Sequence, residues 1–262
     1  MAHLRDRRRG AEGLAVGSSL DALTDLYGLL AREGRAVFGE HRVTLARLAA
    51  QIAAPRLAAR ELSPGGMLQL DALCARVVAK LADAGKLGRF ARVAGRPGLP
   101  RAIARTLRET RTAGLDSKTL AAVAPDLAVL HEEYEAELAR HGLADRALVF
   151  RVATERALGG DTPFAGLPLL IYDVAIAPGI EADFVAALAA RSDNVLATVP
   201  AGDARTLSVL ATALGASVEH APEVRDGSSL ERLQMYLFEE KPLPRAELGP
   251  DVLVLSAPGE SR

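Results

Sequence analysis

The sequence predicts an α/β protein built on a parallel β-sheet, with an all-helical insert in the middle of the chain. Three observations predict this fold class. Residues 13–52 show a strand–helix–strand–helix pattern. Residues 62–142 show amphipathic helices and no strand pattern. Near-continuous apolar runs then return at 167–172 and 194–199, as in parallel strands that helices cover on both faces.

Composition restricts the class of protein. The chain has 262 residues, with 32 Lys and Arg against 33 Asp and Glu, so it is neither a histone-like polycation nor an acidic tail. Any contact with nucleic acid must come from local basic patches. Aromatic residues make up only 4% and Trp is missing, which argues against a surface that stacks bases. We expect the single cysteine, Cys74, to be a buried thiol in a reducing compartment.

Targeting signals are not evident in the sequence. No apolar run approaches the roughly 18 residues that span a membrane. The arginine-rich N-terminus lacks the apolar stretch of a secretory signal. We therefore expect a cytoplasmic protein whose residues 1–10 are disordered.

The first elements are short and alternate in type. Ser18 or Ser19 can cap the first helix, in which apolar residues repeat at helical spacing. The expected elements are a strand at 13–17, a helix from Leu20 to Leu30, a second strand at 36–38, and a helix that begins after Thr44 and carries Leu45, Leu48 and Ile52.

Four amphipathic helices are expected in the insert. They begin near Leu70, Leu99, Asp116 and Asp126. Gly114 and Gly142 follow helices as C-cap glycines do.

Strands return after the insert. Asp145 is expected to cap a helix that ends near Leu158. The later expected elements are strands at 167–172, 194–199, 216–219 and 252–256 and helices at 179–190, 204–214 and 229–238. The strand at 252–256 lies six residues before the end with nothing to cover it, so we expect the chain to be a fragment of a longer polypeptide.

Three segments lie where an α/β sheet would bind a nucleotide. A phosphate-binding loop needs G-x-x-x-x-G-K-[ST], whereas Gly17, Ser18 and Ser19 lead into a helix without a second Gly or a Lys. Asp173 follows a strand, as the Mg²⁺-binding aspartate of an ATPase does. Asp203 follows the next strand. All of them also fit the simpler role of helix cap or loop residue.

Two groups of residues are candidates for contacts with DNA phosphates. They are Arg42, Thr44 and Arg47 at a helix start, and Arg101, Arg105 and Arg108 on one helix face. Arg111 extends the second group by one turn. A solvated helix face shows the same pattern. The histidines lack metal-ligand spacing and no G-x-S-x-G elbow is present, so we expect neither a metal site nor a catalytic residue.

The order of these segments resembles the N-terminal half of the UvrD/Rep-type (superfamily 1) helicase fold, in the degenerate version of AddB-like helicase–nuclease proteins of bacterial double-strand-break repair. The turn after the first strand stands at the family's Walker A loop. Residues 42–52 (RVTLARLAAQI) are similar to its DNA-touching T-F-H-S-L-A segment. Residues 170–174 stand at the D-E-x-Q-D box, 195–203 at motif III, and 252–262 are similar to the strand that opens the second RecA-like half.

The resemblance implies a RecA-like, P-loop-type sheet (helicase 1A domain) at 11–60 plus 143–262 and an all-helical 1B-like insert at 61–142. It implies a DNA partner (a single strand or a duplex end), a helicase–nuclease partner subunit of AddA type, and a downstream PD-(D/E)XK exodeoxyribonuclease domain. The Walker A Lys is missing and Val174 replaces the Walker B Glu. We therefore expect ATP and Mg²⁺ binding to be lost, with no ATPase activity.

The residues alone leave one predicted function and two alternatives. The predicted function is an inactivated helicase-like DNA-binding scaffold for repair and recombination. The alternative is a small-molecule enzyme on a nucleotide- or sugar-binding α/β fold, with Asp173 and Asp203 as ligand groups, although G-x-G-x-x-G is missing. A protein–protein scaffold without a ligand is the third.

Overall fold

The computed structural model describes residues 12–34, 38–220, 227–236 and 245–256. The predicted disordered segment 1–10 lies outside them. The chain divides into two compact units, Met1–Ser217 and Val218–Arg262. No helix of the described residues has the length and apolarity needed to cross a membrane.

A four-stranded parallel sheet forms the centre of the first unit and confirms the predicted α/β class. Its strands are β1 (Gly13–Gly17), β2 (Glu40–Thr44), β5 (Leu169–Tyr172) and β6 (Val195–Thr198). They lie in the order β2-β1-β5-β6, all parallel. The first strand, β1, thus lies between β2 and β5, an order found in doubly wound folds.

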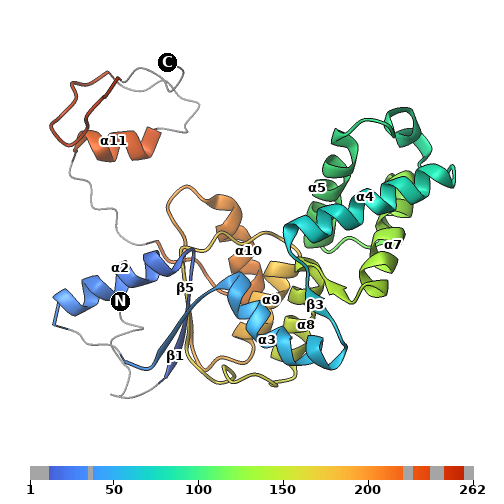
Figure 1. The fold of residues 1–262 in the computed structure, drawn as a ribbon. Helices are drawn as coiled ribbons and strands as arrows, with labels where there is room; N and C mark the ends of the chain where they lie inside the picture. Colours follow the sequence, from blue (N-terminus) through green and yellow to red (C-terminus); the bar gives the residue numbers. More distant parts are fainter. Residues whose placement is uncertain (1–11, 35–37, 221–226, 237–244, 257–262) are drawn as a thin grey trace. The chain divides into compact units, whose positions relative to one another are not determined.

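Helices cover the two faces of this sheet unequally (Figure 1). One face packs against α3 (Leu45–Ala59), α8 (Arg146–Leu158), α9 (Ile180–Ala189) and α10 (Ala204–Leu214). The other packs against α2 (Leu20–Arg32). Alternate side chains of β1 supply both cores, because neighbours along a strand point to opposite faces. Val16 joins the larger cluster and Ala15 the one under α2.

The insert has a hydrophobic core of its own, around residues such as Val77, Leu107 and Leu130. Its elements are α4 (Met67–Asp83), the 3-10 helix η1 (Gly88–Val93), α5 (Gly98–Thr112), α6 (Ser117–Val123) and α7 (Pro125–Arg140). Cys74 is buried in this core, as predicted, and burial, reinforced by the charge of Asp71, raises the pKa of its thiol to about 12.

The prediction that residues 62–142 contain no strand is wrong. A two-residue strand, β3 (Ser63–Pro64), pairs in parallel with β4 (Leu143–Ala144) where the insert leaves and rejoins the sheet region. Two residues are too few to show an apolar alternation, so the pairing leaves no pattern in the sequence.

Four other predicted strands need correction. The strand expected at 36–38 is instead β2, whose only buried residue is Val43; residues 36 and 37 lie outside the described part. The strand at 194–199 is β6, but it is half-buried because the described sheet ends there. Residues 216–219 and 252–256 are not strands, and Leu253 is 78% exposed. Apolar residues form a strand only where a neighbouring strand accepts their hydrogen bonds.

The predicted helices agree more closely with the structure. In the second unit, α11 (Ser229–Tyr236) matches the helix expected at 229–238, of which residues 237 and 238 are not described. The fourth helix of the insert begins at Pro125, one residue before Asp126, which lies in its first turn.

Candidate functional site

The strand register aligns the ends of all four sheet strands. Gly17 lies opposite both Thr44 and Tyr172, and Tyr172 lies opposite Thr198. The segments after these strands therefore meet at one end of the sheet, which we call the carboxyl edge. Doubly wound sheets bind their ligands at this edge, beside the strand where the order reverses. Ser18 and Ser19 therefore follow β1, and Asp173 follows the neighbouring β5, at the same edge of the sheet.

Two polar side chains of the carboxyl edge, Ser19 and Asp173, already have partners within the chain. The Ser19 hydroxyl accepts a hydrogen bond from the Ala22 N–H at 3.0 Å and caps α2. The Asp173 carboxylate accepts one from the Thr198 hydroxyl at 2.7 Å, which ties the end of β5 to the end of β6. Asp173 has a φ of 50°, a left-handed conformation that Asp tolerates better than most residues.

Asp203 is the N-cap of α10. Its carboxylate accepts a hydrogen bond from the Thr206 N–H at 3.0 Å. Hydrogen bonds from Thr206 lower the pKa of Asp203 below its usual value. Like Ser19, Asp203 is thus a helix cap, which is the simpler of the two roles that the sequence allowed.

The turn after β1 is short and packs closely against α2. Only Ser18 and Ser19 separate β1 from α2. A Cβ atom on Gly17 would lie 2.5 Å from Cγ of Leu23, which is fully buried. A phosphate-binding loop needs several consecutive free N–H groups, whereas this turn bends directly into the helix.

The arginines of α5 are exposed on one face, as predicted. Arg108 Nη2 lies 3.3 Å from the Asp71 carboxylate, and Arg105 Nε lies 3.8 Å from Glu109. Arg101 is also exposed. The expectation that Arg111 extends this stripe is wrong, because its side chain is only 3% exposed.

The second group of DNA candidates lies on the sheet region. The guanidinium of Arg42 lies 4.9 Å from the centre of the Tyr27 ring. Thr44 is the N-cap of α3 without a side-chain hydrogen bond, and its register with Gly17 places it at the carboxyl edge. Arg47 is exposed on α3. The α5 arginines belong to the insert, so the two groups are on different parts of the first unit.

A buried ion-pair cluster joins the insert to the sheet region and was missed by the sequence reasoning. Arg111 Nε donates to Asp145 Oδ2 at 2.6 Å, Nη2 lies 3.3 Å from Oδ1, and Nη1 donates to Glu135. Asp145 also caps α8 through the Leu148 N–H, as predicted. Burial opposes the charge of Arg111, but Asp145 and Glu135 outweigh it and raise its pKa.

A signal for this cluster was present in the sequence. Ile103, Leu107 and Arg111 follow at intervals of four residues, so Arg111 continues the apolar side of α5 and not the basic side. An arginine in line with buried apolar residues requires a buried carboxylate partner.

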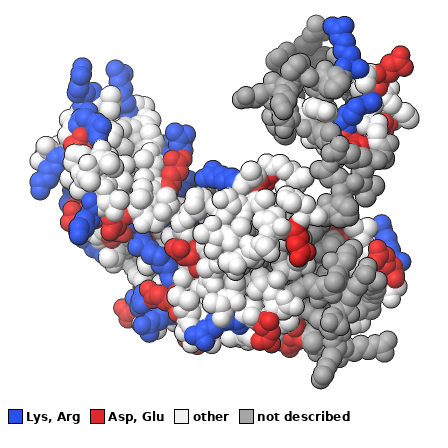
Figure 2. Space-filling view, turned by 180° about the vertical axis from the view of Figure 1, so that it is seen from behind, with Lys and Arg blue, Asp and Glu red and all other residues white. Residues whose placement is uncertain are grey.

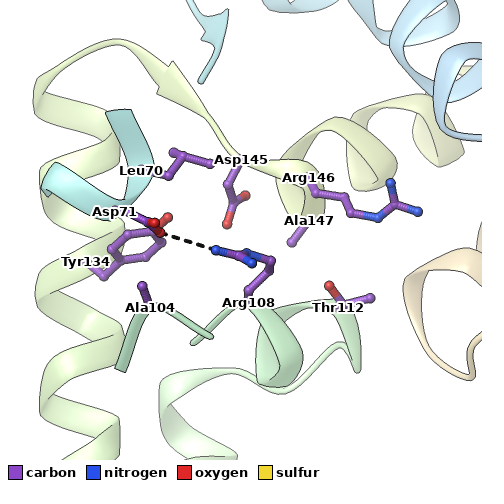
Figure 3. Close-up of a pocket in the computed structure, with 9 residues that line it drawn as sticks. All are labelled: Leu70, Asp71, Ala104, Arg108, Thr112, Tyr134, Asp145, Arg146 and Ala147. Carbon is purple, nitrogen blue, oxygen red and sulfur yellow. Dashed lines mark hydrogen bonds and ion pairs between the residues drawn. The ribbon is translucent and has the colours of Figure 1, made fainter. Parts of the chain in front are cut away.

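Two cavities lie beside this junction. The smaller, of about 40 Å³, is large enough for a water molecule or two; Figure 3 shows Arg108 reaching Asp71 across it and Asp145 at its wall. The larger, of about 310 Å³, is lined mostly by apolar residues of β3, β4, α4 and α8, with Arg108 and Arg146. Neither of these two cavities is lined by Asp173 or Asp203, the ligand groups expected for a small-molecule enzyme.

His131 should make stability depend on pH. Its ring is 1% exposed, and neither ring nitrogen has a hydrogen-bond partner within the described ranges. Burial and the nearby charge of Arg111 lower the pKa of His131. As the pH falls, the imidazole is therefore protonated near pH 6.5 in the unfolded chain but only at a lower pH in the folded chain. The free energy of unfolding decreases as the pH drops through 6.5.

We expect urea unfolding at pH 7.5, 6.5 and 5.5 to show this loss, and His131→Leu to lose less stability over the same range. Equal pH dependence of the two proteins would show that His131 is not responsible.

Among the described residues, no group of three His, Cys, Asp or Glu side chains could hold a metal ion. Neither a protein-family model nor a curated protein sequence gives a significant match to this chain.

Proposed function

We propose that this chain is a helicase-like segment that binds DNA without using ATP, as part of an AddB-like helicase–nuclease protein of double-strand-break repair and recombination. In this proposal the sheet region is a degenerate RecA-like 1A domain and the insert is its 1B counterpart. A partner subunit of AddA type and a downstream exodeoxyribonuclease domain belong to the same proposal, as does a place in the cytoplasm.

The observation that carries the proposal is how the side chains at the carboxyl edge are hydrogen-bonded. The sheet is parallel, and the turns after β1, β5 and β6 lie at the carboxyl edge, where doubly wound sheets bind their ligands. The side chains of Ser19 and Asp203, however, accept hydrogen bonds from the first turns of the helices that they cap, and the Asp173 carboxylate accepts one from Thr198 at the end of the neighbouring strand β6. A γ-phosphate or a magnesium ion would have to displace those hydrogen bonds.

DNA is the ligand that the exposed cations favour. Arg101, Arg105 and Arg108 are spread along one side of α5, and Arg42 and Arg47 flank the start of α3. Arginine side chains on helix surfaces are common phosphate contacts. The insert would then hold the DNA while the motor chemistry is carried out by the partner subunit.

Thermal unfolding with a panel of ligands tests this function. We expect DNA to raise the unfolding temperature, since a ligand at 100 times its Kd stabilises the folded state by about 2.7 kcal/mol. ATP with Mg²⁺ should leave it unchanged, and no phosphate should be released in the presence of DNA. Nucleotide hydrolysis would contradict the proposal, and stabilisation by a nucleotide but not by DNA would favour the small-molecule enzyme.

A further inference from the structure

We propose that residues 84–108 of the insert bind the phosphate backbone of duplex DNA without reading its sequence. This inference rests on the proposed function and specifies the surface and the form of DNA. The segment contains no Asp or Glu. Its seven cations are Lys86, Arg89, Arg92, Arg96, Arg101, Arg105 and Arg108. The remaining 237 residues therefore have a net charge of −8, although the whole chain is close to neutral.

We call these seven side chains the basic surface. All of them are exposed. Figure 2 shows Lys and Arg side chains projecting from the insert, on the left of that view. Lys86, Arg92, Arg96 and Arg101 have no carboxylate within 4.0 Å in the described part of the chain. Four uncompensated charges are thus available to an anionic partner.

The other three cations have only weak partners. Arg89 lies 2.9 Å from Asp126, Arg108 lies 3.3 Å from Asp71, and Arg105 lies 3.8 Å from Glu109. Exposed ion pairs contribute about 1 kcal/mol or less, so a phosphate can replace the carboxylate at small cost.

The basic surface is held in place by the core of the insert. Leu87 is buried and Phe90 packs against the same hydrophobic cluster. The Asp126 carboxylate accepts hydrogen bonds from the backbone and side chain of Arg89. Gly88 has a φ of 53°, and a Cβ there would overlap Asp126 at 2.0 Å, so only glycine allows this approach. The cations are therefore positioned before DNA arrives, which lowers the entropy cost of binding.

The residue types favour a duplex over a single strand. Proteins that bind single strands stack the bases on exposed aromatic rings. The only aromatic residue of the segment is Phe90, which is half-buried, with the Arg89 guanidinium 5.8 Å from its ring centre. A surface of cations alone contacts phosphates, and these are denser along a duplex than along a single strand.

The test compares two variants of the full chain that lose the same charge. One replaces the four unpaired cations of the basic surface (K86A, R92A, R96A, R101A). The control replaces four exposed cations elsewhere (R32A, R56A, K118A, R205A). Fluorescence anisotropy with a labelled duplex and a single strand of equal length, at several salt concentrations, measures binding. Circular dichroism verifies that both variants are folded.

We expect the wild-type chain to bind the duplex about tenfold more tightly than the single strand. The basic-surface variant should lose at least about tenfold in duplex affinity, with the slope of log K against log salt reduced by about 3 to 4, since each lost phosphate contact reduces it by roughly 0.9. The control variant should stay within about threefold of wild type, and polyglutamate of equal charge should displace the duplex poorly.

Three results would overturn the inference while leaving DNA binding intact. They are equal losses in the two variants, wild-type binding of the single strand as tight as that of the duplex, and displacement by polyglutamate as effective as by unlabelled duplex. If the wild-type chain binds no DNA even at low salt, the proposed function itself fails.

Discussion

Arg111→Met is expected to reduce the free energy of unfolding by about 3–5 kcal/mol. The guanidinium of Arg111 is only 3% exposed and contacts the carboxylates of Asp145 and Glu135. Methionine can fill much of the space but carries no charge. The Asp145 carboxylate, 8% exposed, would then be a buried charge with only hydrogen-bond partners from the backbone of α8.

Urea unfolding measures this effect, with Arg105→Met as the matched control on the exposed side of the same helix. We expect the control to change stability by about 0.5 kcal/mol or less. Adding Asp145→Asn to Arg111→Met should recover part of the loss, because asparagine keeps the helix cap and removes the charge. If Arg111→Met were no more costly than Arg105→Met, the buried ion pair would have no structural role.

Gly179→Ala is the second large effect, with an expected loss of about 2–5 kcal/mol from backbone strain and overpacking together. Gly179 precedes α9 with φ 97° and ψ −136°, a conformation that is essentially restricted to glycine. A Cβ there would lie 2.7 Å from the Thr112 carbonyl oxygen and from the carbonyl carbon of Ala113, at the end of α5. Backbone atoms cannot move aside as a side chain can.

The matched control is Gly28→Ala in the middle of α2. Its Cβ would meet nothing within 4 Å, so the better helix propensity of alanine should raise stability by about 0.5–1 kcal/mol. Thermal unfolding of both variants measures the expected loss of stability in Gly179→Ala and the expected gain in Gly28→Ala. A Gly179→Ala protein as stable as wild type would mean that α5 and α9 are not in the close contact described.

Both substitutions act where the insert joins the sheet region. Arg111 lies near the end of α5, Asp145 and Arg146 lie at the start of α8, and Arg146 Nη2 is 2.7 Å from Glu181 of α9. The ion-pair cluster thus joins α5 to α8, and the Gly179 contact joins the end of α5 to α9. The Arg146–Glu181 ion pair joins α8 to α9, and both of these helices pack on the sheet. Three cations of the basic surface, Arg101, Arg105 and Arg108, lie on the same α5, so DNA bound there would be held in a fixed orientation to the sheet.

Local chemistry explains the elements that the sequence predicted well. The strand at 13–17 and the strand that ends at Tyr172 are short apolar runs bounded by turn residues, and the structure places both at the centre of the sheet. Ser19, Asp145 and Asp203 cap helices because each has an N–H three residues later within reach of its side chain. Such contacts span a few residues, so a single sequence contains all that they require.

The sequence by itself therefore determined the α/β class, most helix positions and the helix caps. It also lacks the lysine of a phosphate-binding loop, which argues against a nucleotide site. The tertiary structure alone decided the order of the strands, the burial of Arg111 and the fact that residues 252–256 pair with no strand in the described part of the chain. It also decided which cations of the basic surface are paired, because Asp71 and Asp126 each lie 37 residues away along the chain from the arginine they contact. Contacts over such separations depend on how helices pack, and the local pattern of residues does not encode them.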